Sequence, residues 1–138
     1  MKLLTVKVDR LRTWHRPGLL CIGDAAHAMS PVGGVGINLA IQDAVAAANR
    51  LAVPLSAGAV SDRDLADVQR RRMFPTRATQ RLQIFIHDKF LSRVLMGREP
   101  PAPPWPAKLL GRFPPLQRMA ARVIGLGFRP EHVRTPAA

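Results

Sequence analysis

The sequence predicts an α/β chain in which one or two strands precede mostly helical segments. The apolar run Leu19–Ile22 stands between Pro17-Gly18 and Gly23, which favours a strand buried on both faces, as in a parallel sheet. Residues 4–8 alternate between apolar and polar side chains, which is typical of a half-buried strand. After Gly36, apolar residues recur at helical spacing in several segments.

The first predicted helix runs from about Gly36 to Val53 and ends at Pro54, which cannot donate a backbone hydrogen bond. Its apolar residues at helical spacing are Ile37, Ile41, Ala44, Val45, Ala48 and Ala52. Because its other faces also carry alanine and leucine, we expect this helix to be nearly enclosed.

The second predicted helix begins at Ser61, which can cap it together with Asp64. It reaches about Phe74, where Pro75 kinks or interrupts it before a continuation to about Met96. The continuation carries an apolar stripe that faces the core or a partner, namely Leu82, Phe85, Ile86, Phe90 and Val94. The proline-rich residues 100–104 predict a stiff linker, and a last amphipathic helix contains Leu116, Met119, Ala120, Val123 and Ile124.

The most informative stretch joins an acid, a glycine-rich loop and a helix. Asp24 follows the apolar run, so we expect its carboxylate at the carboxyl end of a strand, where ligands of open α/β sheets bind. The glycines at positions 33, 34 and 36 allow backbone to approach a flat ligand. The first amides of the following helix are unpaired and partly positive, which favours an electron-rich ring edge or an anion.

These residues resemble a known family. The sequence Gly23-Asp24-Ala25-Ala26-His27, with Pro31, Gly33-Gly34, Gly36, Asn38 and Asp43-Ala44 after it, is similar to the second flavin-binding motif of the FAD-dependent aromatic hydroxylase (class A flavoprotein monooxygenase) family. The resemblance covers residues 3–60 well and the helical remainder loosely. It implies the carboxy-terminal part of an FAD-binding Rossmann-like domain, followed by mostly helical segments.

The resemblance also implies the roles of single residues toward FAD. Asp24 would accept hydrogen bonds from the ribityl chain, and Pro31 would lie beside the isoalloxazine ring. The backbone of Val35 to Asn38 would face the pyrimidine edge of the flavin. The cofactor-binding residues expected in this way are Gly23, Asp24, Pro31, Gly34, Val35, Gly36, Ile37 and Asn38.

We therefore expect three regions: residues 1–60 as a partial FAD-binding domain, residues 61–128 as a helical region and residues 129–138 as a tail. The family's GxGxxG turn, which binds the ADP half of FAD, is not found in the sequence. The resemblance thus implies a carboxy-terminal fragment, incomplete and inactive alone, whose partner is the missing N-terminal portion. The complete enzyme would be an FAD-dependent oxidoreductase, a monooxygenase that uses NAD(P)H and O2 on a small organic substrate.

The charge balance leaves one alternative open. The chain has 21 Lys and Arg against 9 Asp and Glu, a formal net charge of +12, which also suits a small basic module that binds nucleic acid or an acidic partner. The basic residues are spread along the chain, and Arg70-Arg71-Arg72 is the one tight run. Aromatic residues make up only 5%, without tyrosine, so no stacking platform is visible and nucleic acid is not expected.

Other candidate residues indicate structural roles, and no catalytic residue is assigned. His15, His87 and His132 are too dispersed for a metal site, and Cys21 is the single cysteine, so no metal is expected. We interpret His27 as structural. An unpaired charge inside an apolar helix is unfavourable, so Asp43 should bind an arginine or a backbone N–H.

No targeting or membrane segment is predicted. Residues 1–10 carry charges and lack the apolar core of a signal peptide. Residues 25–41 have no formal charge, but Pro31 and the glycines break the segment, so no membrane span is expected. We therefore expect a cytoplasmic protein.

Overall fold

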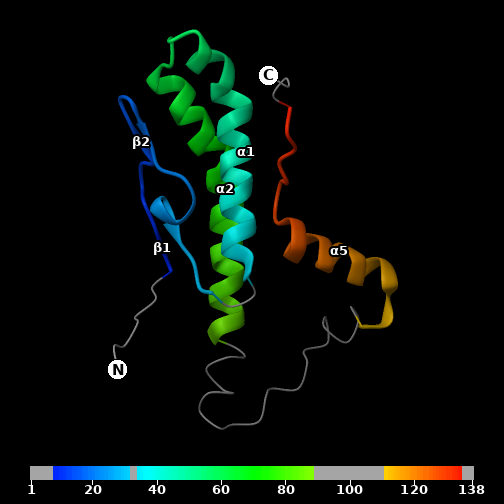
Figure 1. Cartoon of the computed structure of the whole chain (residues 1–138). Helices are drawn as coiled ribbons and strands as arrows, with labels where there is room; N and C mark the ends of the chain where they lie inside the picture. The colour runs from blue at the N-terminus through cyan, green and yellow to red at the C-terminus, as the bar shows by residue number, and fades with distance from the viewer. Residues whose placement is uncertain (1–7, 32–33, 89–110, 135–138) are drawn as a thin grey trace, which may run out of the picture.

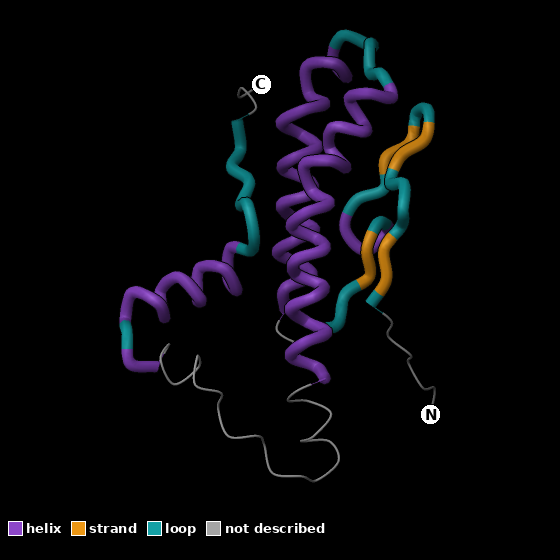
Figure 2. The backbone as a smooth tube through the Cα atoms, turned by 180° about the vertical axis from the view of Figure 1, so that it is seen from behind, coloured by secondary structure: helices purple, strands orange, loops and turns teal. Residues whose placement is uncertain are grey.

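A long antiparallel helix pair organises the molecule. The computed structural model describes residues 8–31, 34–88 and 111–134. Helices α1 (Val35–Ser56) and α2 (Asp62–Ile86) lie side by side, with the short strands on one side and α5 (Pro114–Leu126) on the other (Figure 1). Figure 2 shows the same order from behind. The described chain is thus mostly helical, as predicted, with a few short strands.

The strands form two small antiparallel pairs. Strand β1 (Asp9–Arg10) pairs with β4 (His27–Ala28), and β2 (His15–Arg16) pairs with β3 (Leu19–Leu20). A 3-10 turn, η1 (Gly23–Ala25), lies between β3 and β4.

The prediction of a buried parallel strand over Leu19–Ile22 is wrong. Only Leu19 and Leu20 are extended in β3, the pairing is antiparallel, and Leu19 is 55% exposed. The cause is local, because Gly18 has a φ of 74° and Pro17-Gly18 reverses the chain directly onto β2. Asp24 consequently lies in η1 rather than at the end of a parallel strand.

The helix end predicted at Pro54 is wrong, and of the kink or interruption predicted at Pro75 the structure excludes the interruption. Helix α1 continues through Pro54 to Ser56, where the Ser56 hydroxyl and the Ala57 amide bond to the Val53 carbonyl. Helix α2 is not interrupted at Pro75, which is buried inside it. A proline inside a helix costs about 3 kcal/mol, because it cannot donate a backbone hydrogen bond and its ring meets the preceding turn.

The capping box predicted for α2 is confirmed. The Ser61 side chain accepts a hydrogen bond from the Asp64 amide, and the Asp64 side chain accepts one from the Ser61 amide.

Helix α1 is not enclosed as expected, since Ile37 is 71% exposed and Ile41 is 57% exposed.

The hydrophobic core sits where α1 and α2 meet. Leu51, Leu65 and Val68 form its buried centre, with Leu20 and Val60 packed against it. The face of α2 changes character beyond this cluster. Its buried residues there are Arg72, Pro75, Thr76, Thr79, Gln80 and Gln83, so hydrogen bonds replace apolar packing.

The carboxy-terminal segment runs along α1 in the same direction. Asn38 donates to the Gly125 carbonyl, Gln42 to the Leu126 carbonyl and Asn49 to the His132 carbonyl. The predicted tail is described as far as Arg134, and this part contacts the helix pair.

Several expectations lie outside the described residues: most of the strand at residues 4–8, Gly33, the end of the apolar stripe at Phe90 and Val94, and the linker at residues 100–104.

Gly23 joins the strand side to α1, which gives a testable prediction. Its φ is 57°, and a Cβ there would lie 3.0 Å from the Cβ of Ala40. Gly23→Ala should therefore lower the free energy of unfolding by about 2–4 kcal/mol, from left-handed strain and from the collision. Urea unfolding measures this change.

Gly18→Ala is the matched control. Gly18 also has a positive φ, 74°, but no atom lies within 4 Å of its added Cβ. Only the strain remains, about 1–2 kcal/mol. Equal losses in the two variants would contradict the close approach of Gly23 to α1.

Candidate functional site: a cleft at the amino terminus of helix α1

The predicted motif residues surround a cleft beside the start of α1. The cleft has a volume of about 400 Å³. It is lined by Asp24, Met29, Ser30, Pro31, Gly34, Gly36, Ile37, Ala40 and Ile41. The structure thus brings together Asp24 from η1, Pro31 from the loop, and Gly34, Gly36 and Ile37 from the helix start.

The remaining predicted residues lie around this cleft without lining it. Gly23 is buried behind Asp24, against α1. Val35 lines a separate, mostly apolar cavity between α2 and α5. The Asn38 side chain points to the end of α5, where its Nδ2 lies 3.1 Å from the Gly125 oxygen. Sequence reasoning missed the lining residues Met29, Ser30, Ala40 and Ile41.

The cleft joins a free acceptor to the positive end of a helix. Asp24 is exposed, and an ionised carboxylate accepts hydrogen bonds from hydroxyl groups. Gly34 is the N-cap of α1 with a φ of 63°, no described side chain caps the helix, and its first turn carries no acidic residue. The 22-residue helix therefore directs uncompensated N–H groups and its positive dipole end toward this region.

A buried carboxylate holds this loop against both long helices. Asp43 Oδ2 accepts a hydrogen bond from the Gly23 amide at 3.1 Å and lies 2.5 Å from His27 Nε2. Asp43 Oδ1 accepts a hydrogen bond from Arg72 Nε at 2.8 Å. Asp43, His27 and Arg72 are all fully buried. We call these three residues the Asp43 network.

The Asp43 network keeps this carboxyl ionised. Burial alone would raise the pKa of Asp43, because it disfavours the charged form. Hydrogen bonds from His27 and Arg72, and then their charges, outweigh that effect and leave the pKa below its ordinary value of 3.8. Asp43 therefore accepts hydrogen bonds as a carboxylate at neutral pH.

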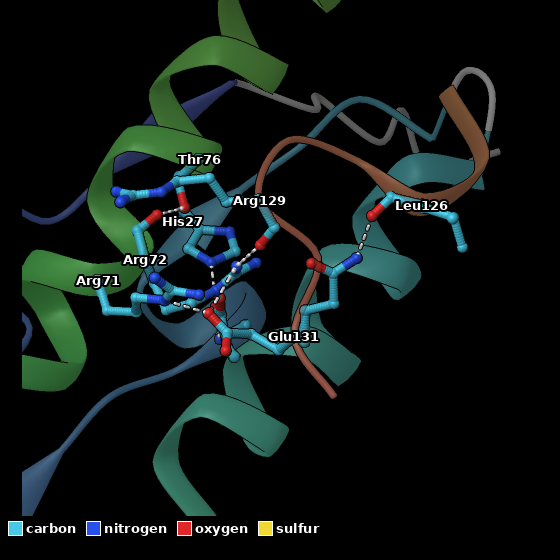
Figure 3. Close-up of polar contacts among 10 residues, drawn as sticks. His27, Arg71, Arg72, Thr76, Leu126, Arg129 and Glu131 are labelled. Atoms are coloured by element: carbon cyan, nitrogen blue, oxygen red, sulfur yellow. Dashed lines mark hydrogen bonds and ion pairs between the residues drawn. The ribbon is translucent and has the colours of Figure 1, made fainter. Parts of the chain in front are cut away.

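A second layer continues the network to the carboxy-terminal segment. Figure 3 shows Arg71 and Arg72 reaching from α2 toward Glu131, where Arg71 Nε lies 2.5 Å and Arg72 Nη1 lies 3.9 Å from Glu131 Oε1. Arg72 Nη1 also donates to the Arg129 carbonyl at 3.4 Å. Each of these contacts joins α2 to the segment after α5.

His27 has the structural setting that the sequence indicated. It is 1% exposed, its ring lies 5.2 Å from that of Trp14, and Nδ1 finds no partner among the described residues. The expectation for Asp43 is confirmed, since it binds both an arginine and a backbone N–H. Arg72 itself was missed. Its spacing after Leu65 and Val68 places it on the buried face of α2, which is the signal that could have found it.

Neither a metal-binding cluster nor a membrane-spanning helix is found in the described part of the chain. Residues 8–31, 34–88 and 111–134 contain no group of three or more His, Cys, Asp or Glu side chains that could hold a metal ion. Among the same residues, no helix has the length and apolar character needed to cross a bilayer.

Comparison with known proteins gives a family and several relatives. The family described as "FAD binding domain" matches residues 1–82. A 6-methylpretetramide 4-monooxygenase of Streptomyces rimosus is 41% identical over 125 residues, which is 89% of this chain and 29% of that protein. An FAD-dependent monooxygenase of Claviceps paspali is 34% identical over 86% of this chain and 23% of its own length. Another, from Epichloe festucae, is 31% identical over 70% of this chain.

The chain thus spans less than a third of the length of these relatives, between 22% and 29%. No solved structure matches it. The family match favours the flavin interpretation of the glycine loop over the alternative of a small basic binding module.

The Asp43 network gives a second prediction. Asp43→Ala should lower the free energy of unfolding by about 3–5 kcal/mol, because it removes the carboxylate that pairs with the buried Arg72 at 2.8 Å and leaves that guanidinium, among the described residues, only the longer ion pair with Glu131. Asp62→Ala is the control, since Asp62 is exposed in the first turn of α2 and its loss should cost below about 1 kcal/mol. Chemical denaturation compares the two variants with the parent, and similar small losses in both would contradict the role given to Asp43.

Proposed function

We propose that this chain, which belongs to the FAD binding domain family of class A flavoprotein monooxygenases, forms the flavin side of an FAD site. The observation that supports this most strongly is the shared cleft, in which the Asp24 carboxylate and the amino terminus of α1 lie on one concavity. A hydroxylated chain and an electron-rich ring edge are the two chemical features that such a pair of groups recognises.

The residues present fit the group that the family implies. In this proposal the Asp24 carboxylate accepts a hydrogen bond from a ribityl hydroxyl of FAD. Asp24 is free for this role because it is exposed and its side chain forms no hydrogen bond or ion pair among the described residues. Gly34 offers open space at the helix N-cap, since no atom lies within 4 Å of the position of an added Cβ.

The apolar lining suits the flat ring system. Ile37 and Ile41 are exposed on α1 and, with Pro31, line the cleft. A ring placed over them would remove apolar surface from water, at about 25 cal/mol for each Å². We propose that the cofactor, together with protein outside the described residues, covers this exposed face of α1.

The amino terminus of α1 would supply the electrostatic part of the site. Bound FAD would supply the redox chemistry of a monooxygenase. The chain contributes the unpaired amides and the positive dipole end at residues 35–38, which stabilise negative charge on the pyrimidine edge. No described residue is assigned to proton transfer.

The finer predictions from the sequence belong to the same proposal. They are a flavin-binding part at residues 1–60, a helical part at 61–128 and a tail at 129–138. NAD(P)H as reductant, O2 as co-substrate, a small organic substrate, an N-terminal portion as partner and a cytoplasmic location also remain predictions.

The test measures FAD retention in a chimera. The chain replaces the matching segment of the Streptomyces rimosus relative, and bound FAD is measured by absorbance and fluorescence. Asp24→Ala should weaken FAD binding by about 1.5–3 kcal/mol, the usual worth of a hydrogen bond to a charged group. Because Asp24 is exposed, the free energy of unfolding should stay within about 0.5 kcal/mol of the parent.

Asp24→Asn keeps the shape and part of the hydrogen bonding, so it should lie between the parent and Asp24→Ala. Asp62→Ala removes one negative charge far from the cleft and should retain FAD fully. If the parent chimera folds but binds no FAD, the proposed function is wrong. If Asp24→Ala binds FAD like the parent, the role of Asp24 is wrong.

A further inference from the structure

A second cleft lies on the strand side of the molecule, between β1 and α2. Its volume is about 570 Å³. Its lining is strongly basic, with Arg10 and Arg12 from the amino-terminal segment and Arg77 and Arg81 from α2. The apolar lining residues are Val8, Leu11, Met73 and Ile84. The proposed flavin cleft has a different lining, and the two share no residue.

A buried glutamine fixes the two walls of this basic cleft. Gln80 is 2% exposed, and its Nε2 donates to the Asp9 carbonyl at 2.8 Å and to the Ala28 carbonyl at 3.1 Å. Its Oε1 accepts a hydrogen bond from Arg10 Nη1 at 2.9 Å. Gln80 therefore holds β1 against α2 and orients the Arg10 guanidinium at the same time.

The positive charge of the cleft is not neutralised within the described residues. None of its four arginines forms an ion pair there. Asp9 is the single acidic lining residue, and its Oδ1 accepts a hydrogen bond from the Arg10 amide at 2.7 Å. Arg77 and Arg81 stand one helical turn apart on α2, where like charges repel each other.

We propose that this basic cleft binds a phosphorylated small molecule through Arg10, Arg12, Arg77 and Arg81. Guanidinium groups bind phosphate oxygens in a bidentate manner, and such charge-assisted hydrogen bonds are stronger than neutral ones. An anion between the walls also removes the repulsion between Arg77 and Arg81. The inference does not rest on the residues of the flavin proposal, because the two clefts share no lining residue.

The shape of the site favours a compact anion over an acidic protein segment. The arginines come from two walls of one concavity, so they can surround a group that presents several oxygens at once. A cavity of about 570 Å³ lies in the range of small-molecule sites. The apolar lining residues offer contacts to the organic part that carries the phosphate.

The experiment is a calorimetric titration of the chain with inorganic pyrophosphate at low ionic strength, followed by titrations with phosphate and with ADP. Arg77→Gln/Arg81→Gln should weaken pyrophosphate binding at least about tenfold, because two charged donors are lost. The matched control is Arg118→Gln/Arg122→Gln, which removes the same charge at the same helical spacing from exposed positions on α5. It should change binding less than about twofold, through the weak field of distant charges.

Arg12→Gln provides a second variant outside any helix, and thermal unfolding checks that each variant folds. Tighter binding of ADP than of pyrophosphate would show that the nucleoside contributes, and equal binding would assign the site to the phosphates alone. Both results support the proposal. Equal weakening by the α2 and α5 double variants would overturn it, since binding would then follow net charge. Absence of saturable binding, or full displacement by an equimolar polyglutamate peptide, would overturn it as well.

Discussion

The rest of the structure depends on one buried carboxylate. Asp43 stands in the middle of α1 and receives hydrogen bonds from the Gly23 amide, the His27 ring and the Arg72 guanidinium. These donors belong to η1, β4 and α2, so one carboxylate of α1 binds three other elements. The Asp43 carboxylate therefore holds these elements together, as apolar side chains do in a hydrophobic core. It also fixes the position of the loop that carries Asp24.

The Asp43 network fixes the positions of these elements more than it adds net stability. A buried ion pair is often no more stabilising than well-packed apolar residues, but removal of one partner leaves a buried unpaired charge, which is strongly destabilising. Arg72 also reaches the Arg129 carbonyl and Glu131, so the carboxy-terminal segment is fixed to the same centre. The contacts thus connect the proposed flavin cleft to parts of the chain far away in sequence.

Two features could be predicted from the sequence, the capping box of α2 and the need of Asp43 for a partner, because each depends on residues that are close together in the chain. Ser61 and Asp64 form a capping box because both partners lie within one turn, and Asp43 needed a partner because its apolar surroundings are contiguous in sequence. Other features were not predicted. Helix α2 continues through Pro75, which is buried. Leu19–Leu20 fold back on β2 at the Pro17-Gly18 reversal, which the apolar run Leu19–Ile22 did not indicate. Arg72 looked like part of a solvated basic run, yet its register places it on the buried face.

The most direct measurement of the Asp43 network follows two NMR signals through an acid titration, the Asp43 side-chain carboxyl carbon and the Gly23 amide proton. Since the pKa of Asp43 is below 3.8 in the folded protein, its stabilisation is fully present above that pH and is lost as the pH falls through the folded-state pKa. Both signals should move together with one midpoint below 3.8, because the amide donates to this carboxylate. An Asp43 midpoint at or above 3.8, or a Gly23 amide that does not respond to it, would contradict the position given to Asp43 at the centre of the fold.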